Sequence, residues 1–220
     1  LLSDNRKRIS LKLPDVPPGM SAAIYWEYLE TPGTPFEEAM EQWEELLNEH
    51  GSSFDTTWSG FEQAEMDRLK AFRHGVPELV NFAVARYQKK APSIRKVSTD
   101  SALPAHAFVR VFERSISLVE QHSLEYVCFG HLGDYHLHIN ILPRTQEEFD
   151  TARRVYGQLM ALATEVGGTV SAEHGIGRIK VAYLAQMYGD EAIGGMKRIK
   201  AALDPGWLLN PGNLFTGPAA

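Results

Sequence analysis

The 220-residue sequence is short of several features that would each point to a particular class of protein. Its single cysteine, Cys128, rules out an internal disulfide and is typical of a reducing compartment. No apolar run reaches about 18 residues, so no membrane-spanning helix is expected. With 22 Lys and Arg against 28 Asp and Glu, the net charge of −6 argues against a nucleic-acid surface. No glycine-rich loop of the kind that cradles phosphates occurs near the start.

Composition and residue periodicity favour an α+β fold. Hydrophobic residues make up 44% and charged residues 23% of the sequence, values ordinary for a globular protein. Alternation of polar and apolar residues predicts strands, and helical spacing follows two capping sequences, at 34–37 and 145–148. Strands are expected at 21–30, 53–59, 124–129, 136–141 and 169–171, and helices at 34–51, from 61 to a break at Pro77, at 104–122, 145–167 and 180–203. Two rounds of strand, helix and strand indicate helices packed on an antiparallel sheet.

The stretch GHLGDYHLHIN (130–140) predicts a β-hairpin that carries histidines. A β-rich apolar run precedes it, and polar and apolar residues alternate after the link at 132–135, which contains Gly and Asp. With a four-residue link, His131 lies opposite His136. His138 is then the diagonal neighbour of His131 on the same face, roughly 7–8 Å away at the backbone. The hairpin is therefore expected to present a histidine-rich face above an apolar one.

Two histidines at this separation can share one metal ion, and a third ligand is expected from elsewhere in the chain. Glu173 is the best candidate, because glycines at 167–168 before it and at 175 and 177 after it allow the backbone to turn sharply. Its neighbour His174 is expected to point the other way, toward a different partner. Two histidines and one carboxylate with an open position favour a catalytic divalent ion, zinc above others. The predicted ligands are His131, His138 and Glu173.

The same residues also have structural interpretations in which they bind no metal ion. Histidine-rich hairpins also occur as solvated sheet faces. His136 is interpreted as a structural residue or as a partner of a ligand, and Cys128 as a small core residue rather than a nucleophile.

Three sequence blocks in this order resemble the C-terminal half of the FAD-linked 2-hydroxyacid dehydrogenases. They are GHLGDYHLHIN at 130–140, SAEHGIG at 171–177 and LDPGWLLNPGNLF at 203–215, with weaker matches in FRHGVPE and KVSTDSALP. The family includes D-lactate dehydrogenase, the glycolate oxidase FAD subunit and D-2-hydroxyglutarate dehydrogenase. The chain departs from the family signatures at Tyr135 and His136, where Gly-Asn is usual, and at Asn213, where Lys is usual.

The resemblance implies a fold and a domain organisation. The fold is a ferredoxin-like cap domain with a duplicated antiparallel sheet, helices on one face and a C-terminal helical segment. Residues 1–20 would lead in from a flavin-binding domain that this chain lacks. Residues 21–178 would form the substrate domain, and residues 179–220 would contact the flavin domain. The chain is thus interpreted as the C-terminal part of a longer polypeptide or as a separate subunit.

The resemblance also implies functions for individual residues. Arg73, whose forked guanidinium suits a carboxylate, would bind the substrate carboxylate with Lys96 as a second candidate. Asn140, on the histidine face, would orient the substrate. His174 would act as general base, a function that imidazole side chains often serve, and would lie against the flavin. Asn210 would hydrogen-bond a flavin edge, although without the resemblance it is only a turn residue.

The resulting hypothesis is oxidation of a D-2-hydroxy acid of the lactate, glycolate or 2-hydroxyglutarate type. The metal would act on the 2-hydroxyl group as a Lewis acid, and FAD would accept the hydride from C2. An electron-acceptor protein or quinone would be a further partner, with a homodimer left open. A cytoplasmic location is expected, with peripheral membrane association as a variant. Two alternatives are a metal-dependent hydrolase that needs no flavin and a non-catalytic, metal-stabilised interaction domain.

Overall fold

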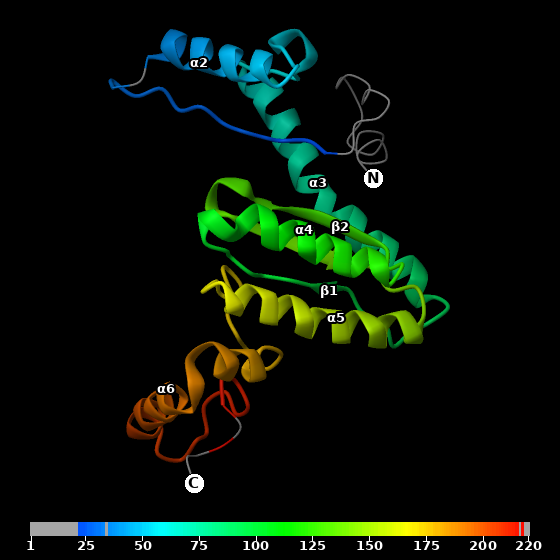
Figure 1. Ribbon diagram of the computed structural model, residues 1–220, viewed down its shortest axis with the longest axis vertical. Coiled ribbons are helices and arrows are strands. Elements are labelled where there is room, and N and C mark those ends of the chain that lie inside the picture. The colour runs from blue at the N-terminus through cyan, green and yellow to red at the C-terminus, as the bar shows by residue number, and fades with distance from the viewer. Residues whose placement is uncertain (1–21, 34, 216, 218–220) are drawn as a thin grey trace. The chain divides into compact units, whose positions relative to one another are not determined.

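The computed structural model describes residues 22–33, 35–215 and 217 (Figure 1). The chain divides into two compact units, Leu1–Phe82 and Ala83–Ala220. Helix α3 (Gln63–Gln88) contains the boundary between them. The predicted lead-in at 1–20 and the predicted cap residue Thr34 lie outside the described residues.

The first unit contains helix α2 (Phe36–Glu49), the 3-10 helix η1 (Phe54–Thr56) and the first part of α3. The predicted strand at 21–30 is wrong, because residues 22–30 belong to no regular element. Its aromatic side chains pack on helices instead, and Trp26 stacks on Trp43 of α2 with ring centroids 4.3 Å apart. Alternation in this segment therefore reflects contacts with helices rather than pairing within a sheet.

Two further predictions in the first unit are wrong. The expected strand at 53–59 is η1, in which the Thr56 hydroxyl donates to the Ser53 carbonyl at 2.8 Å and accepts from the Ser53 amide at 3.2 Å. These local hydrogen bonds compete with an extended conformation. Pro77 does not end α3, which continues to Gln88. A proline removes one helical hydrogen bond, yet the helix is continuous past it and buries Val80 in the following turn.

The second unit is organised around a three-stranded antiparallel sheet with the strand order β1-β3-β2. The strands are β1 (Val97–Ser98), β2 (Tyr126–His131) and β3 (His136–Ile141). The 3-10 helix η2 (Leu132–Asp134) joins β2 to β3, and Tyr135 after it adopts the left-handed conformation at φ 52°. The register pairs His131 with His136 and Phe129 with His138, which confirms the predicted hairpin.

Helices α4 (Ala105–Gln121) and α5 (Gln146–Glu165) pack with the apolar face of the sheet and form the core of this unit. Ile139 and Ile141 of β3 lie in that core with residues of both helices. The predicted cap of α5 is confirmed, since the Thr145 hydroxyl accepts the Glu148 amide at 3.2 Å. Helix α6 (Val181–Leu203) follows, with a non-helical residue at Gly189.

The chain therefore has an α+β fold, as expected. The predicted strand at 169–171 is reduced to one bridge between Ala102 and Thr169. The described residues contain one small sheet of named strands, so the ferredoxin-like duplication stays a prediction. No helix within the described ranges is long and apolar enough to cross a membrane.

Candidate functional site at the histidine face of the hairpin

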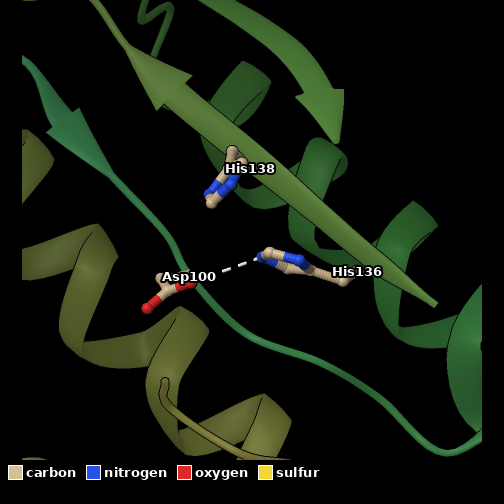
Figure 2. A group of neighbouring side chains, drawn as sticks. All are labelled: Asp100, His136 and His138. Atoms are coloured by element: carbon tan, nitrogen blue, oxygen red, sulfur yellow. Dashed lines mark ion pairs between the residues drawn. The ribbon is translucent and has the colours of Figure 1, made fainter. Parts of the chain in front are cut away.

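Strand β3 places His136, His138 and Asn140 on the face opposite the apolar core, as the period of two requires. This face is not solvated. His136 is 2% exposed, His138 8% and Asn140 1%. Figure 2 shows His136 and His138 on β3 with Asp100 opposite them, on the segment that follows β1. A solvated sheet face is thereby excluded for these three residues.

Glu173 lies against four histidine rings. Its Oε1 is 3.0 Å from His131 Nε2 and 3.4 Å from His136 Nδ1. Its Oε2 is 3.6 Å from His138 Nε2 and 4.0 Å from His174 Nε2. The structure thus gathers all four sequence-predicted metal and catalytic residues, His131, His138, Glu173 and His174, and adds His136 to them.

His174 does not point away from Glu173 as expected. Its ring lies 5.2 Å from that of His138, and its Nε2 faces the same Glu173 oxygen. The reason is that residues 172–174 form bends rather than extended chain, so the alternation of a strand does not apply. The side chain of His174 is 66% exposed and is the most open of the four histidines around Glu173.

Asp100 anchors the loop that carries Glu173 and His174. Its carboxylate accepts the backbone amides of Glu173 and His174 at 3.1 Å each and the Ser171 hydroxyl at 2.9 Å. Lys180 donates to the same carboxylate at 2.6 Å, and both charged residues are buried. One carboxylate therefore sets the position of the loop against the sheet.

The sequence reasoning did not identify Asp100 and Lys180. Their side chains meet across 80 positions of sequence, which no local periodicity can reveal. The only available signal was that each lies within or just after a block that resembles the family signatures.

Burial and hydrogen bonding act in opposite directions on the pKa of Asp100. Burial alone would raise it, but the Lys180 ammonium, the two backbone amides and the Ser171 hydroxyl outweigh burial and hold the pKa well below its usual range. Burial, reinforced by the neighbouring His138, lowers the pKa of His136. Asp100 is therefore a carboxylate at neutral pH, and His136 is a neutral imidazole.

The donor atoms of this site fit a divalent ion. Two ligands at about 2.0–2.1 Å from a tetrahedral zinc ion lie roughly 3.3 Å apart, and Glu173 is 3.0 Å from His131 and 3.6 Å from His138. Within the described residues, two sets of donor atoms are mutually close enough to hold one ion: Asp100 with His136 and His138, and His138 with Glu173 and His174. His138 and Glu173 thus belong to a suitable set, whereas His131 approaches Glu173 at its other oxygen.

A hydrogen bond to the backbone prepares His138 for this function. Its Nδ1 lies 2.7 Å from the Thr99 carbonyl oxygen, which can only accept, so Nδ1 carries the proton. The lone pair of the neutral ring is then on Nε2, which faces Glu173. Metal-binding histidines are commonly oriented in this way.

Each of the other predicted residues has its own contacts. Asn140 donates from Nδ2 to the His138 carbonyl at 3.2 Å, while its buried Oδ1 has no hydrogen-bond partner in the structure. Burial lowers the pKa of Lys96. Arg73 belongs to the first unit, where its guanidinium lies 5.8 Å from the centre of the Tyr25 ring. Asn210, in the second unit, is exposed.

The chain belongs to the family described as FAD linked oxidases, C-terminal domain, whose model matches residues 8–214. It is 38% identical over 159 residues to D-2-hydroxyglutarate dehydrogenase of Xanthomonas citri pv. viticola, covering 69% of this chain and 31% of that protein. It is 34% identical over 142 residues to glycolate oxidase subunit GlcD of Escherichia coli strain K12, covering 61% and 28%. It is also similar to the mitochondrial D-lactate dehydrogenase [cytochrome] 1 of Saccharomyces cerevisiae, at 31% identity over 128 residues, covering 58% and 22%.

The matched part of the chain thus spans between 22% and 31% of the length of these curated relatives. The family resemblance inferred from the sequence blocks is confirmed.

Proposed function

We propose that this chain is the substrate-binding, C-terminal part of an FAD-dependent enzyme that oxidises a D-2-hydroxy acid to the 2-oxo acid. The observation that carries the proposal is the convergence of four histidine rings on the Glu173 carboxylate, in a chain of the FAD-linked oxidase family. The relatives whose names specify a substrate act on glycolate, D-lactate or D-2-hydroxyglutarate. All three substrates carry a hydroxyl group next to a carboxylate.

A divalent ion, with zinc as the first candidate, would be held by His131, His138 and Glu173. When bound, it would supply Lewis-acid polarisation of the substrate hydroxyl group. The chain's own contribution is to aim the ligands. The Thr99 carbonyl orients His138, and Asp100 holds the Glu173 backbone over the sheet.

His174 would take the proton of the 2-hydroxyl group at Nε2. It suits this function because its side chain is two-thirds exposed while its Nε2 lies beside the Glu173 carboxylate. The backbone amide of His174 donates to the Asp100 carboxylate at 3.1 Å, which fixes the position of the backbone from which the side chain extends. FAD, when bound, would supply the hydride acceptor, so His174 would be needed only for the proton.

The other predicted residues would bind the substrate and the flavin. Arg73 and Lys96 would bind the substrate carboxylate, Asn140 would orient the substrate, and His174 with Asn210 would contact the flavin. The flavin would come from a flavin-binding domain that would contact residues 179–220. The ferredoxin-like duplicated cap at 21–178 is the corresponding proposal for the fold.

The test is metal content followed by substrate binding. We expect about one zinc ion per chain in the purified protein, and its loss from His138→Ala and Glu173→Ala. The matched control is His106→Ala, at an exposed position on α4. Calorimetry on the zinc-loaded chain should then show that D-lactate, glycolate or D-2-hydroxyglutarate binds, with preference for the D form where the acid is chiral. Absence of zinc from the wild type, or binding of none of the three acids, would contradict the proposal.

A further inference from the structure

His136 is placed as a ligand would be. The family signature has Asn at this position, and the His136 residue is 2% exposed. Its Nδ1 lies 3.4 Å from Glu173 Oε1, within the separation expected for two ligands of one ion. Its ring centroid is 4.4 Å from that of His138, the next residue on the same face of β3. His136 therefore faces the same carboxylate as His131 and His138.

The second nitrogen of His136 has the surroundings typical of a metal-bound histidine. Such a residue usually donates its other ring N–H to a carboxylate or a carbonyl group, which fixes the ring. His136 Nε2 lies 3.4 Å from Asp100 Oδ1, as the dashed line in Figure 2 marks, and has no hydrogen bond in the structure. Asp100 Oδ1 is thus the acceptor nearest to this nitrogen on the side away from Glu173, at a longer distance than the 2.7 Å hydrogen bond between His138 and the Thr99 carbonyl.

The carboxylates around His136 suit a cation. His136 lies against a carboxylate oxygen at each ring nitrogen, with Asp100 Oδ1 3.4 Å from Nε2 and Glu173 Oε1 3.4 Å from Nδ1. The same Glu173 oxygen lies 3.0 Å from His131 Nε2. A divalent ion held by Glu173 would therefore be within reach of His136 Nδ1, while Nε2 stays on the side of Asp100.

We propose that His136 is a further metal ligand through Nδ1, so that three histidines and Glu173 hold the ion, with Asp100 as the outer partner of His136. The inference rests on the proposed function, since it adds a ligand to the same centre. It assigns to Asp100 a double function, because the carboxylate that anchors the Glu173 loop also orients one ligand. Asp100 itself is not counted as a ligand, because its oxygens already accept from Lys180, Ser171 and two backbone amides.

The first experiment measures zinc affinity by chelator competition on the full chain. His136→Asn introduces the residue of the related signature at this position. We expect this variant to lose more than about 100-fold in zinc affinity, beyond the range of 10–100-fold typical for loss of an outer partner. His106→Asn, on the exposed surface, is the matched control and should stay within twofold of the wild type. His138→Ala reports on the centre itself.

The outcomes separate the two proposals. If the wild type binds zinc and His138→Ala abolishes binding while His136→Asn loses 100-fold or less, His136 is not a ligand and the proposed centre stands. If the wild type binds no zinc, both proposals are wrong. Because a buried residue is replaced, X-ray absorption at the zinc edge of the wild type gives a second measurement that needs no variant. Three imidazole ligands are expected, and two would overturn the inference.

Discussion

The two faces of strand β3 are buried to the same degree by different means. On one face, Ile139 is 5% and Ile141 0% exposed, and both lie in the core with α4 and α5. On the other, His136 is 2% and Asn140 1% exposed. The first face needs only apolar neighbours of suitable shape. Each polar group on the second needs a partner, because an unpaired buried polar group costs on the order of 1–3 kcal/mol.

The difference shows where the site's specificity lies. The apolar face tolerates exchange among side chains of similar volume, whereas the polar face depends on defined pairs, such as His138 with the Thr99 carbonyl. Two polar atoms there, His136 Nε2 and Asn140 Oδ1, are buried without a hydrogen-bond partner in the structure. An apolar core has no such atoms. The polar face is therefore the one that can bind a further polar group or an ion.

The largest effect is expected from breaking the anchor of the polar face. Asp100→Asn keeps the shape but leaves the buried Lys180 ammonium without its counter-charge. Removal of one partner of a buried ion pair costs about 3–5 kcal/mol. Urea unfolding of the chain should show this loss, while Asp150→Asn on the exposed surface of α5 should change stability by less than about 0.5 kcal/mol. A cost below 1 kcal/mol for Asp100→Asn would show that the pair does not hold the loop.

Bound zinc should raise the free energy of unfolding through its contacts with the polar face of β3, and it should leave the packing of the apolar face unchanged. At a free concentration 100 times its dissociation constant, an ion that binds only the folded state stabilises it by about 2.7 kcal/mol. Urea unfolding with and without zinc measures the difference. Glu173→Gln should abolish the gain, because it removes the carboxylate on which the histidines converge. An equal gain in this variant would place the ion elsewhere.

A smaller effect is expected on the apolar face. Ile141→Val removes one buried methylene group and should cost about 0.5–1.5 kcal/mol in urea unfolding. Because the Ile141 side chain points to the core and not to the histidines, zinc affinity should stay within twofold of the wild type. A tenfold change in affinity would mean that the two faces are mechanically coupled.

The smallest effect is expected at Cys128, which pairs with Ile139 in the sheet and packs against the core. Burial raises the pKa of its thiol to about 12, so its thiolate fraction at pH 8 is roughly 10³-fold below that of an unfolded cysteine. A thiol reagent should label the urea-unfolded chain rapidly and leave the native chain almost unlabelled in the same time. Equal labelling rates would show that the apolar face opens readily.

Local sequence patterns were sufficient for the hairpin and for several helices. The alternation after residue 135 predicted that Ile139 and Ile141 lie opposite the histidines, and the four-residue link predicted the pairing of His131 with His136. The expected helices at 104–122 and 145–167 correspond to α4 and α5 within a few residues. These features depend on the period of the backbone and on turn chemistry, which neighbouring residues determine.

The same patterns failed where neighbouring residues do not decide the outcome. Residues 22–30 alternate like a strand but pack on a helix through Trp26, and Pro77 lies inside a continuous helix. At residues 22–30, the contact of Trp26 with Trp43 overrides the local preference.

The sequence by itself determined the hairpin, its register and the residue types that can hold a metal ion, because spacing along a strand follows directly from the chain. Only the tertiary structure decided which of those residues meet. Asp100 and Lys180 are 80 positions apart, yet their ion pair holds the loop that carries Glu173 to the histidines. The tertiary structure also decided the surroundings of His136. Its two nitrogens face two carboxylates only because the segment after β1 and the loop that carries Glu173 both lie against the histidine face of β3, and no periodicity encodes that approach.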